Sequence, residues 1–248
     1  MKKLVALVAA SLFTLSLAVR AEDAPAPAPA PAPSPAVTPA TAPEAAGIGA
    51  WTTDFDAAQK VSAERHLPLF IEFTGSDWCG WCKKMEEECL SKPEFLEAMK
   101  TRCVLVSIDF PHKTVLSPAL KAQNSKVADE FKKSRGFPSY VLVDSDGKTV
   151  RWNFGAHPKY GKDLKLLISD IDGFTAACEG NVSRATAKLA EDAAKAYRDE
   201  VAVYAAKQQE VLAWLASNPK GPESKTKFAA FQDELKASRD KMSALLPK

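Results

Sequence analysis

Two cysteines separated by two residues, Cys79 and Cys82, have the types and spacing best suited to chemistry in this chain. A thiolate attacks a disulfide sulfur, and a second thiol three positions away can then displace the first partner, so the spacing favours a redox pair. The same spacing also supplies half of many zinc sites, which need two further ligands. The other candidate ligands show no second paired spacing: Cys89, Cys103, Cys178, His66, His112 and His157. No metal site is therefore predicted.

A buried strand and a helix are expected to position this pair. Residues 69–73 are nearly all apolar, which is typical of a strand covered on both faces. A helix is predicted from Cys79 to about Leu90. Cys79 then lies in the first turn, where unpaired N–H groups and the helix dipole stabilise a thiolate. The pattern predicts that Cys79 is the exposed nucleophile and that Cys82 resolves the mixed disulfide.

Charge is mixed, both around the pair and over the whole chain. Lys83 and Lys84 add positive potential near Cys79 whereas Asp77 opposes it, so the net effect on the thiolate stays open. The chain has 33 basic and 31 acidic residues, a formal net charge of +2, and the two signs are interspersed. This balance does not favour binding to nucleic acid.

Around the pair, residues 51–174 alternate helical and strand patterns in the manner of an α/β domain. Helices are predicted over residues 54–66, after Pro93, and over about 125–134 and 162–176; strands are predicted at 103–110, 140–143 and 149–152. Residues 144–147 form a good turn between the last two strands, which predicts a β-hairpin. Residues 48–178 are long enough for one independent core.

The last part of the chain, residues 179–248, has a different pattern. Apolar residues recur at helical spacing in two stretches that are separated by breakers at 218–222, which predicts a helical hairpin. Two interpretations stay open for this hairpin. It could be a packing extension of the preceding domain, or a surface for a homodimer or partner through residues 183–248.

The N-terminal part carries an export signal and a spacer. Residues 1–21 have a basic start, an apolar run and a plausible cleavage site, which predicts a secretory signal peptide, with an uncleaved anchor or a buried hydrophobic helix as the alternatives. Residues 22–47 alternate Ala and Pro, a linker composition that favours extended polyproline II structure. The mature protein is expected in the periplasm or outside the cell, where five cysteines cannot all pair within the chain.

Three motifs resemble the thioredoxin superfamily. Residues 73–85 resemble its strand, active-site turn and helix, residues 135–139 its cis-proline loop, and residues 154–156 its glycine loop. Within the superfamily the sequence is similar to secreted bacterial proteins related to the C-terminal domain of the transmembrane disulfide reductase. The resemblance implies a thioredoxin fold, a central mixed sheet flanked by helices, to which this chain adds its C-terminal helical hairpin.

The resemblance also implies roles for single residues. Pro138 would be cis, and the Phe137 backbone would pair with an extended substrate, near Gly155. Glu72 would be a buried acid behind the second cysteine that accepts its proton, with a solvated edge position as the alternative. Exposed indole rings at Trp78 and Trp81 could form an apolar docking rim, although one ring could instead pack under the loop. The rim role fits Trp81 better.

These features favour a thiol-disulfide oxidoreductase that exchanges disulfides in exported proteins, as a reductase or isomerase kept reduced by a membrane-bound electron donor. No cofactor beyond the Cys79–Cys82 disulfide is expected. The dipeptide Gly80-Trp81 departs from the Gly-Pro of thioredoxin, so the direction of electron flow stays open. The alternative is a dimeric client-binding or assembly module that uses the C-terminal helices and has little redox turnover.

Overall fold

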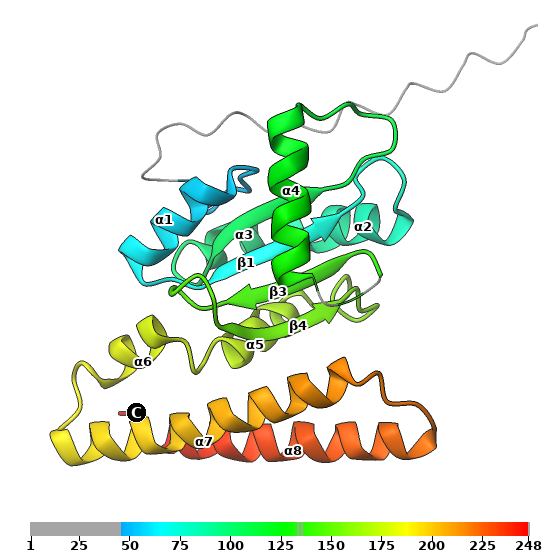
Figure 1. The fold of residues 1–248 in the computed structure, drawn as a ribbon. Coiled ribbons are helices and arrows are strands. Elements are labelled where there is room, and N and C mark those ends of the chain that lie inside the picture. The colour runs from blue at the N-terminus through cyan, green and yellow to red at the C-terminus, as the bar shows by residue number, and fades with distance from the viewer. Residues whose placement is uncertain (1–45, 133, 135, 248) are drawn as a thin grey trace, which may run out of the picture. The chain divides into compact units, whose positions relative to one another are not determined.

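A mixed four-stranded sheet forms the centre of the part of the chain that the computed structural model describes, residues 46–132, 134 and 136–247 (Figure 1). The strands are β1 Leu69–Thr74, β2 Val104–Asp109, β3 Ser139–Val143 and β4 Val150–Gly155, in the order β2-β1-β3-β4. β2 runs parallel to β1, whereas β3 is antiparallel to both β1 and β4. The signal segment 1–21 and residues 22–45 of the linker lie outside the described residues.

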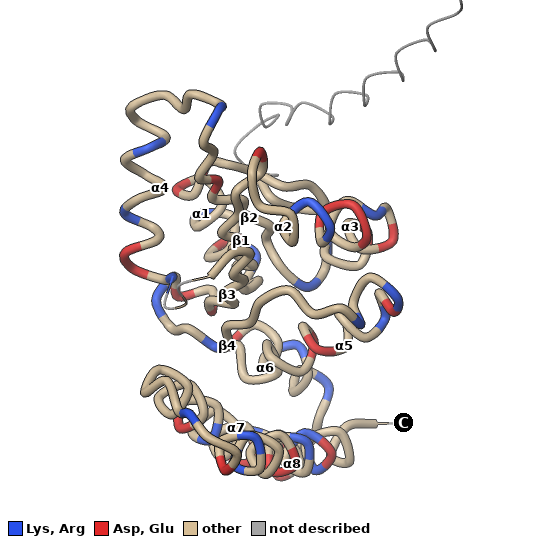
Figure 2. The backbone as a smooth tube through the Cα atoms, turned by 90° about the vertical axis from the view of Figure 1, so that its right-hand side faces the viewer, with Lys and Arg blue, Asp and Glu red and all other residues tan. Residues whose placement is uncertain are grey.

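Helices cover both faces of this sheet, as its apolar strands require. They are α1 Phe55–Arg65, α2 Gly80–Met85, the π-helical turn η2 Glu86–Leu90, α3 Pro93–Met99, α4 Pro118–Phe131 and α5 Leu164–Phe174. The edge-on view in Figure 2 shows α1 and α4 on one face and α2, α3 and α5 on the other. A separate hydrophobic core lies on each face of the sheet, and alternate residues of β1 pack into one or the other. Ile71 and Phe73 face α1 and α4, and Phe70 faces the layer of α2, α3 and α5.

Local capping explains where several helices begin. Asp54 caps α1 as predicted, because its carboxylate accepts a hydrogen bond from the Ala57 N–H at 2.9 Å. α4 starts earlier than the predicted residue 125, so that boundary was wrong. Ser117 accepts a hydrogen bond from the Leu120 N–H, and Pro118 occupies the first helical position.

Three more helices follow α5: α6 Glu179–Thr186, α7 Glu191–Ala216 and α8 Pro222–Ala244. α7 and α8 form the predicted hairpin (Figure 1), whereas α6 was not predicted. α7 packs into the same core as α5, where the buried Tyr204 hydroxyl donates to the Gly173 carbonyl oxygen at 2.7 Å. Gln208 likewise donates to the Phe174 carbonyl oxygen at 2.9 Å. None of the helices in the described residues is both long enough and apolar enough to span a bilayer.

Both outer strands of the sheet are covered by neighbouring chain. Residues 47–52 run along β2, where the Leu105 N–H donates to the Gly47 carbonyl and Thr52 pairs with Val106. The predicted linker therefore contains two residues, Ala46 and Gly47, that pack on the sheet. On the other side α7 lies along β4, and Gln209 donates to the Val150 carbonyl oxygen at 2.9 Å. Covered edges are protected against pairing with other chains.

Candidate active site

The cysteine pair lies at the start of α2, after the turn that follows β1. Cys79 and Cys82 are joined by a disulfide with their Cα atoms 5.2 Å apart, inside the range that a disulfide bridges. Cys79 is the residue that caps α2, and its sulfur accepts a hydrogen bond from the Cys82 N–H at 3.2 Å. The Cys79 N–H in turn donates to the Gly75 carbonyl oxygen at 2.8 Å, which fixes the turn before the helix.

The two sulfur-bearing residues differ in accessibility. Cys79 is 6 % exposed and Cys82 is 1 % exposed, so the prediction of an openly exposed Cys79 was wrong for this disulfide state. The order of exposure nevertheless agrees with a first attack at Cys79 and an internal attack by Cys82. Trp81, which lies between them in the sequence, is 50 % exposed.

Glu72 lies inside the molecule on β1, and a position at a solvated edge is contradicted because the residue is only 3 % exposed. Its neighbours across the sheet are Ser107 on β2 and Tyr140 on β3. Burial, with added repulsion from the carboxylates of Glu86 and Asp109, raises the pKa of Glu72 to about 8. Such a carboxyl can exchange a proton near neutral pH.

Glu86 is a candidate that sequence reasoning missed. It follows Cys82 by four residues, so both side chains lie on the same side of the helix, toward Glu72. Although part of its side chain reaches solvent, desolvation also raises the pKa of Glu86. Its four-residue spacing from the second cysteine was the signal that could have identified it. Two interacting carboxyl groups with raised pKa values are thus present, and one of them, Glu86, lies one helical turn after Cys82.

The predicted cis-proline loop lies at the start of β3. The Phe137–Pro138 peptide bond is cis, as expected from the resemblance. Pro138 is buried, and no other described residue forms a hydrogen bond with the Phe137 backbone. Gly155 pairs with Ser139 across the β3–β4 ladder, and a Cβ atom at Gly155 would lie 3.5 Å from the Pro138 carbonyl oxygen. The two predicted loops therefore meet at one end of the sheet.

The two tryptophans of the active-site turn have different surroundings. Trp78 donates from Nε1 to the Phe110 carbonyl oxygen at 2.8 Å, and its ring stacks on His112 with centroids 4.6 Å apart. Its ring also meets Phe137 edge-on, with centroids 5.4 Å apart. Trp81 has no such partner among the described residues and presents its ring to solvent. Trp78 is thus held in place, whereas Trp81 is free to contact a substrate.

The remaining cysteines are core residues. Cys89, Cys103 and Cys178 are unpaired and buried, in agreement with the sequence-based interpretation. Burial raises the pKa of all three thiols, which disfavours the reactive thiolate. His157 is exposed, with its ring near Tyr160, as expected of a loop histidine. Within the described ranges, no three His, Cys, Asp or Glu side chains gather as metal ligands would.

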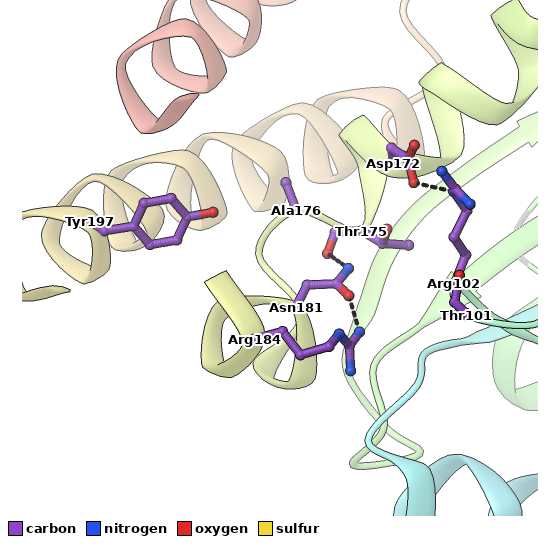
Figure 3. A pocket seen from close by; sticks show the side chains of 8 residues that line it. All are labelled: Thr101, Arg102, Asp172, Thr175, Ala176, Asn181, Arg184 and Tyr197. Carbon is purple, nitrogen blue, oxygen red and sulfur yellow. Dashed lines mark hydrogen bonds and ion pairs between the residues drawn. The ribbon is translucent and has the colours of Figure 1, made fainter. Parts of the chain in front are cut away.

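A polar pocket lies at the other end of the sheet (Figure 3). It is lined by Thr101, Arg102, Asp172, Thr175, Ala176, Asn181, Arg184 and Tyr197. Thr101 and Arg102 precede β2, whereas Cys79 follows the parallel strand β1, so the pocket and the disulfide are at opposite strand ends. Both guanidinium groups are already engaged, Arg102 with Asp172 at 2.8 Å and Arg184 with Asn181. The pocket is therefore separate from the candidate redox site at the disulfide.

A cysteine pair at a helix start, a cis-proline loop beside it and a mixed sheet between two helical layers define a thioredoxin-like protein. The family model described as thioredoxin-like matches residues 50–145 of the chain.

Two curated relatives from Chlamydia pneumoniae are similar to the chain. The disulfide bond reductase DsbH is 34 % identical over 108 residues, which is 44 % of this chain and 64 % of that protein. The thioredoxin-related protein DsbJ is 29 % identical over 100 residues, which is 40 % of this chain and 28 % of the relative. A solved structure titled DsbH oxidoreductase has 29 % identity and a TM-score of 0.43 over 53 % of this chain and 92 % of its own. The matches thus cover less than two thirds of both curated relatives.

Proposed function

We propose that this chain is a thiol-disulfide oxidoreductase that acts on exported proteins as a reductase or isomerase. The observation that carries the proposal is the Cys79–Cys82 disulfide at the start of α2, beside the cis-proline loop at Pro138. The name of the relative DsbH, a disulfide bond reductase, supports the same class of reaction. The signal-like segment 1–21 supports export to the periplasm or the outside of the cell.

The reaction begins with the reduced pair. The Cys79 thiolate attacks one sulfur of a client disulfide, whose S–S bond breaks as a new bond forms between Cys79 and the client. The displaced client sulfur leaves as a thiolate and takes up a proton. The N–H groups at the start of α2 stabilise negative charge on the attacking sulfur.

Resolution of the mixed disulfide uses Cys82. Its thiol loses a proton and attacks the Cys79 sulfur, which releases the second client sulfur as a thiolate that is then protonated. The client gains two electrons and two protons, and Cys79 and Cys82 become a disulfide. A further turnover as a reductase needs a two-electron dithiol donor, for which we propose a membrane-bound partner. An isomerase cycle instead returns the pair to the dithiol when a client thiol attacks the mixed disulfide.

Glu72 supplies the proton acceptor for the second step. Its raised pKa, about 8, lets the carboxylate take a proton from a nearby thiol and return it near neutral pH. Glu86 interacts with this buried carboxyl, and its own side chain is exposed to solvent. We assign Glu86 the exchange of this proton with water.

Client binding uses the surface around the pair. An extended client segment would pair with the Phe137 backbone, which makes no hydrogen bond with the other described residues. The exposed Trp81 ring would cover an apolar client side chain. The chemistry needs no metal or further cofactor, and the small net charge gives no reason to propose a nucleic-acid partner.

The test is reduction of insulin disulfides by dithiothreitol, with the full chain and its Cys79→Ser variant. Cys178→Ser is the matched control because Cys178 is buried and unpaired outside the site. We expect Cys79→Ser to abolish the acceleration and Cys178→Ser to retain it. Cys82→Ser is expected to accumulate a mixed disulfide between Cys79 and insulin, seen as a mass adduct that reductant removes. Equal acceleration by wild type and Cys79→Ser would refute the proposal.

The direction of electron flow requires a separate measurement. Equilibration of the Cys79–Cys82 pair with glutathione gives its reduction potential, for which about 30 mV corresponds to a tenfold change in the equilibrium constant. A reductase or isomerase is expected to have a more reducing potential than the strongly oxidising thiol oxidases. A potential in that oxidising range would contradict the proposed direction.

A further inference from the structure

The active-site turn is bound along its length to the loop that precedes α4. We call residues 110–117, between β2 and α4, the flanking loop. Three successive residues of the turn, Ser76, Asp77 and Trp78, each contact this loop or the end of β2 just before it. The contacts involve the residues immediately before Cys79.

Asp77 makes the largest share of these contacts. Its carboxylate accepts hydrogen bonds from three consecutive backbone N–H groups of the flanking loop, those of His112 at 2.9 Å, Lys113 at 2.6 Å and Thr114 at 3.0 Å. The Lys83 ammonium group also donates to the Asp77 carbonyl oxygen at 3.1 Å. A carboxylate with three such donors sets the path of the loop, because those N–H groups have no partner in regular secondary structure.

The neighbouring residues complete the connection. Ser76 donates both its N–H and its hydroxyl to the Asp109 carboxylate, at 2.9 and 2.5 Å. Trp78 donates to the Phe110 carbonyl oxygen, and its ring stacks on His112, one of the residues held by Asp77. The loop that Asp77 holds is therefore also the surface on which the Trp78 ring rests.

The same contacts reach the client-binding side of the site. Phe137 packs edge-on against Trp78 at 5.4 Å and against Phe110 at 5.9 Å. The Lys132 ammonium group lies 4.4 Å from the centre of the Phe137 ring. The Phe137 side chain is thus held between the active-site turn and the flanking loop. Its backbone is the group to which we assign client pairing.

The flanking loop also presents an apolar side chain to solvent. Val115 is 93 % exposed and follows the three residues whose N–H groups bind Asp77. A protein client that reaches the disulfide can contact this loop, whereas a small disulfide needs only the sulfur atoms and their immediate surroundings. The loop can therefore affect the binding of large clients more than the reaction of the sulfurs.

We infer that Asp77 is a positioning residue for client selection: by holding the flanking loop against Trp78 and Phe137, it shapes the surface that binds protein disulfides. This inference rests on the proposed function. The three backbone hydrogen bonds also lower the pKa of Asp77 to about 2, so the carboxylate stays ionised at any pH at which thiol exchange proceeds.

The experiment compares two substrates with the full-length chain and its Asp77→Ala variant. One substrate is insulin and the other is hydroxyethyl disulfide, a small molecule with no side chains for the loop to contact. We expect Asp77→Ala to raise the KM for insulin about tenfold with a smaller effect on kcat, and to change the rate with hydroxyethyl disulfide much less. The reduction potential is measured for both proteins, because loss of a charge near Cys79 affects both substrates alike.

Two further variants separate the causes. Asp146→Ala is the matched control, since Asp146 binds the Lys148 and Thr149 N–H groups of the β3–β4 turn in the same manner, far along the sheet from the disulfide. It is expected to leave both substrates unaffected. Asp77→Asn keeps an acceptor oxygen without the charge. Its KM for insulin should therefore lie between the values for wild type and Asp77→Ala. Asp77→Asn also provides the comparison with wild type if Asp77→Ala does not fold.

Hydrogen exchange at the amides of residues 112–114 verifies that the loop was released in Asp77→Ala and not in Asp146→Ala. Equal loss of activity on insulin and hydroxyethyl disulfide in the Asp77 variants would overturn the inference, because a general effect on the cysteines would explain it. Unchanged insulin kinetics in variants with a released loop would overturn it as well. If the proposed function itself is wrong, wild type and Cys79→Ser will show the same activity on both substrates.

Discussion

Replacing Glu72 by Gln should make the protein more stable at neutral pH, and the gain should depend on pH. Burial raises the pKa of Glu72 to about 8 from an ordinary value of 4.5. Between these two values the native state keeps the proton that the unfolded state releases. Unfolding therefore releases a proton, and the free energy of unfolding falls as pH rises through this window. Gln keeps the size of the side chain and cannot ionise.

The magnitude follows from the two pKa values. Each pKa unit corresponds to about 1.4 kcal/mol, and pH 7 lies two and a half units above the ordinary value of 4.5. Between pH 4 and pH 7, the unfolding free energy of wild type should therefore fall by about 3 kcal/mol more than that of Glu72→Gln. The loss should level off above pH 8, where the native carboxyl also ionises.

Urea unfolding, followed by circular dichroism at several pH values and constant ionic strength, measures this difference with the Cys79–Cys82 disulfide intact. Glu64→Gln is the matched control, because the Glu64 side chain is about half exposed on α1. Its unfolding free energy should follow that of wild type at every pH. Parallel pH profiles for wild type and Glu72→Gln would refute the reasoning, since they would mean that Glu72 titrates alike in the folded and unfolded chains.

Two other changes test the C-terminal helices. Tyr204→Phe removes the buried hydroxyl that donates to the Gly173 carbonyl, and it should lower the unfolding free energy by about 1 to 3 kcal/mol in urea titrations; an unchanged midpoint would mean that water replaces the hydroxyl. One surface open to a homodimer through residues 183–248 is the outer surface of α7, where Val203 is 58 % exposed, because the facing sides of α7 and α8 already pack together. Val203→Asp should halve the mass of such a dimer by light scattering, and a stable dimer in the variant would exclude this surface.

The elements with strong local signals could be predicted from sequence. The run of apolar residues in β1 and the Asp54 cap of α1 each act through their immediate neighbours, so their positions were predicted correctly. The start of α4 was missed because the polar residues before 125 conceal a Ser117-Pro118 helix start that periodicity does not reveal. The π-helical turn η2, whose Cys89 and Leu90 are buried, left no recognisable pattern in the sequence.

In the candidate site, too, the features with a local sequence signal could be predicted, whereas contacts between distant segments could not. The cysteine spacing and the proline at 138 are sequence features and identified the reactive turn and the adjoining loop. The contacts of Asp77 with residues 112–114 join segments 35 to 37 positions apart, so no local pattern predicts them. From sequence, Asp77 appeared only as a charge that opposes the Cys79 thiolate. In the structure, its carboxylate instead accepts hydrogen bonds from backbone N–H groups of the flanking loop.

The packing of α7 into the core beside α5 has a consequence for where the chain can be divided. Tyr197, Tyr204 and Val211 of α7 share one core with Leu167 and Ile171 of α5. A fragment that ended at Cys178 would leave the carbonyl groups of Gly173 and Phe174 without their hydrogen-bond partners on α7, and β4 without its neighbour. We expect the smallest autonomously folding unit to extend at least through α7, to Ala216. On this expectation the thioredoxin-like region is not a detachable module, and a transplant of its proposed redox chemistry would have to carry this helix with it.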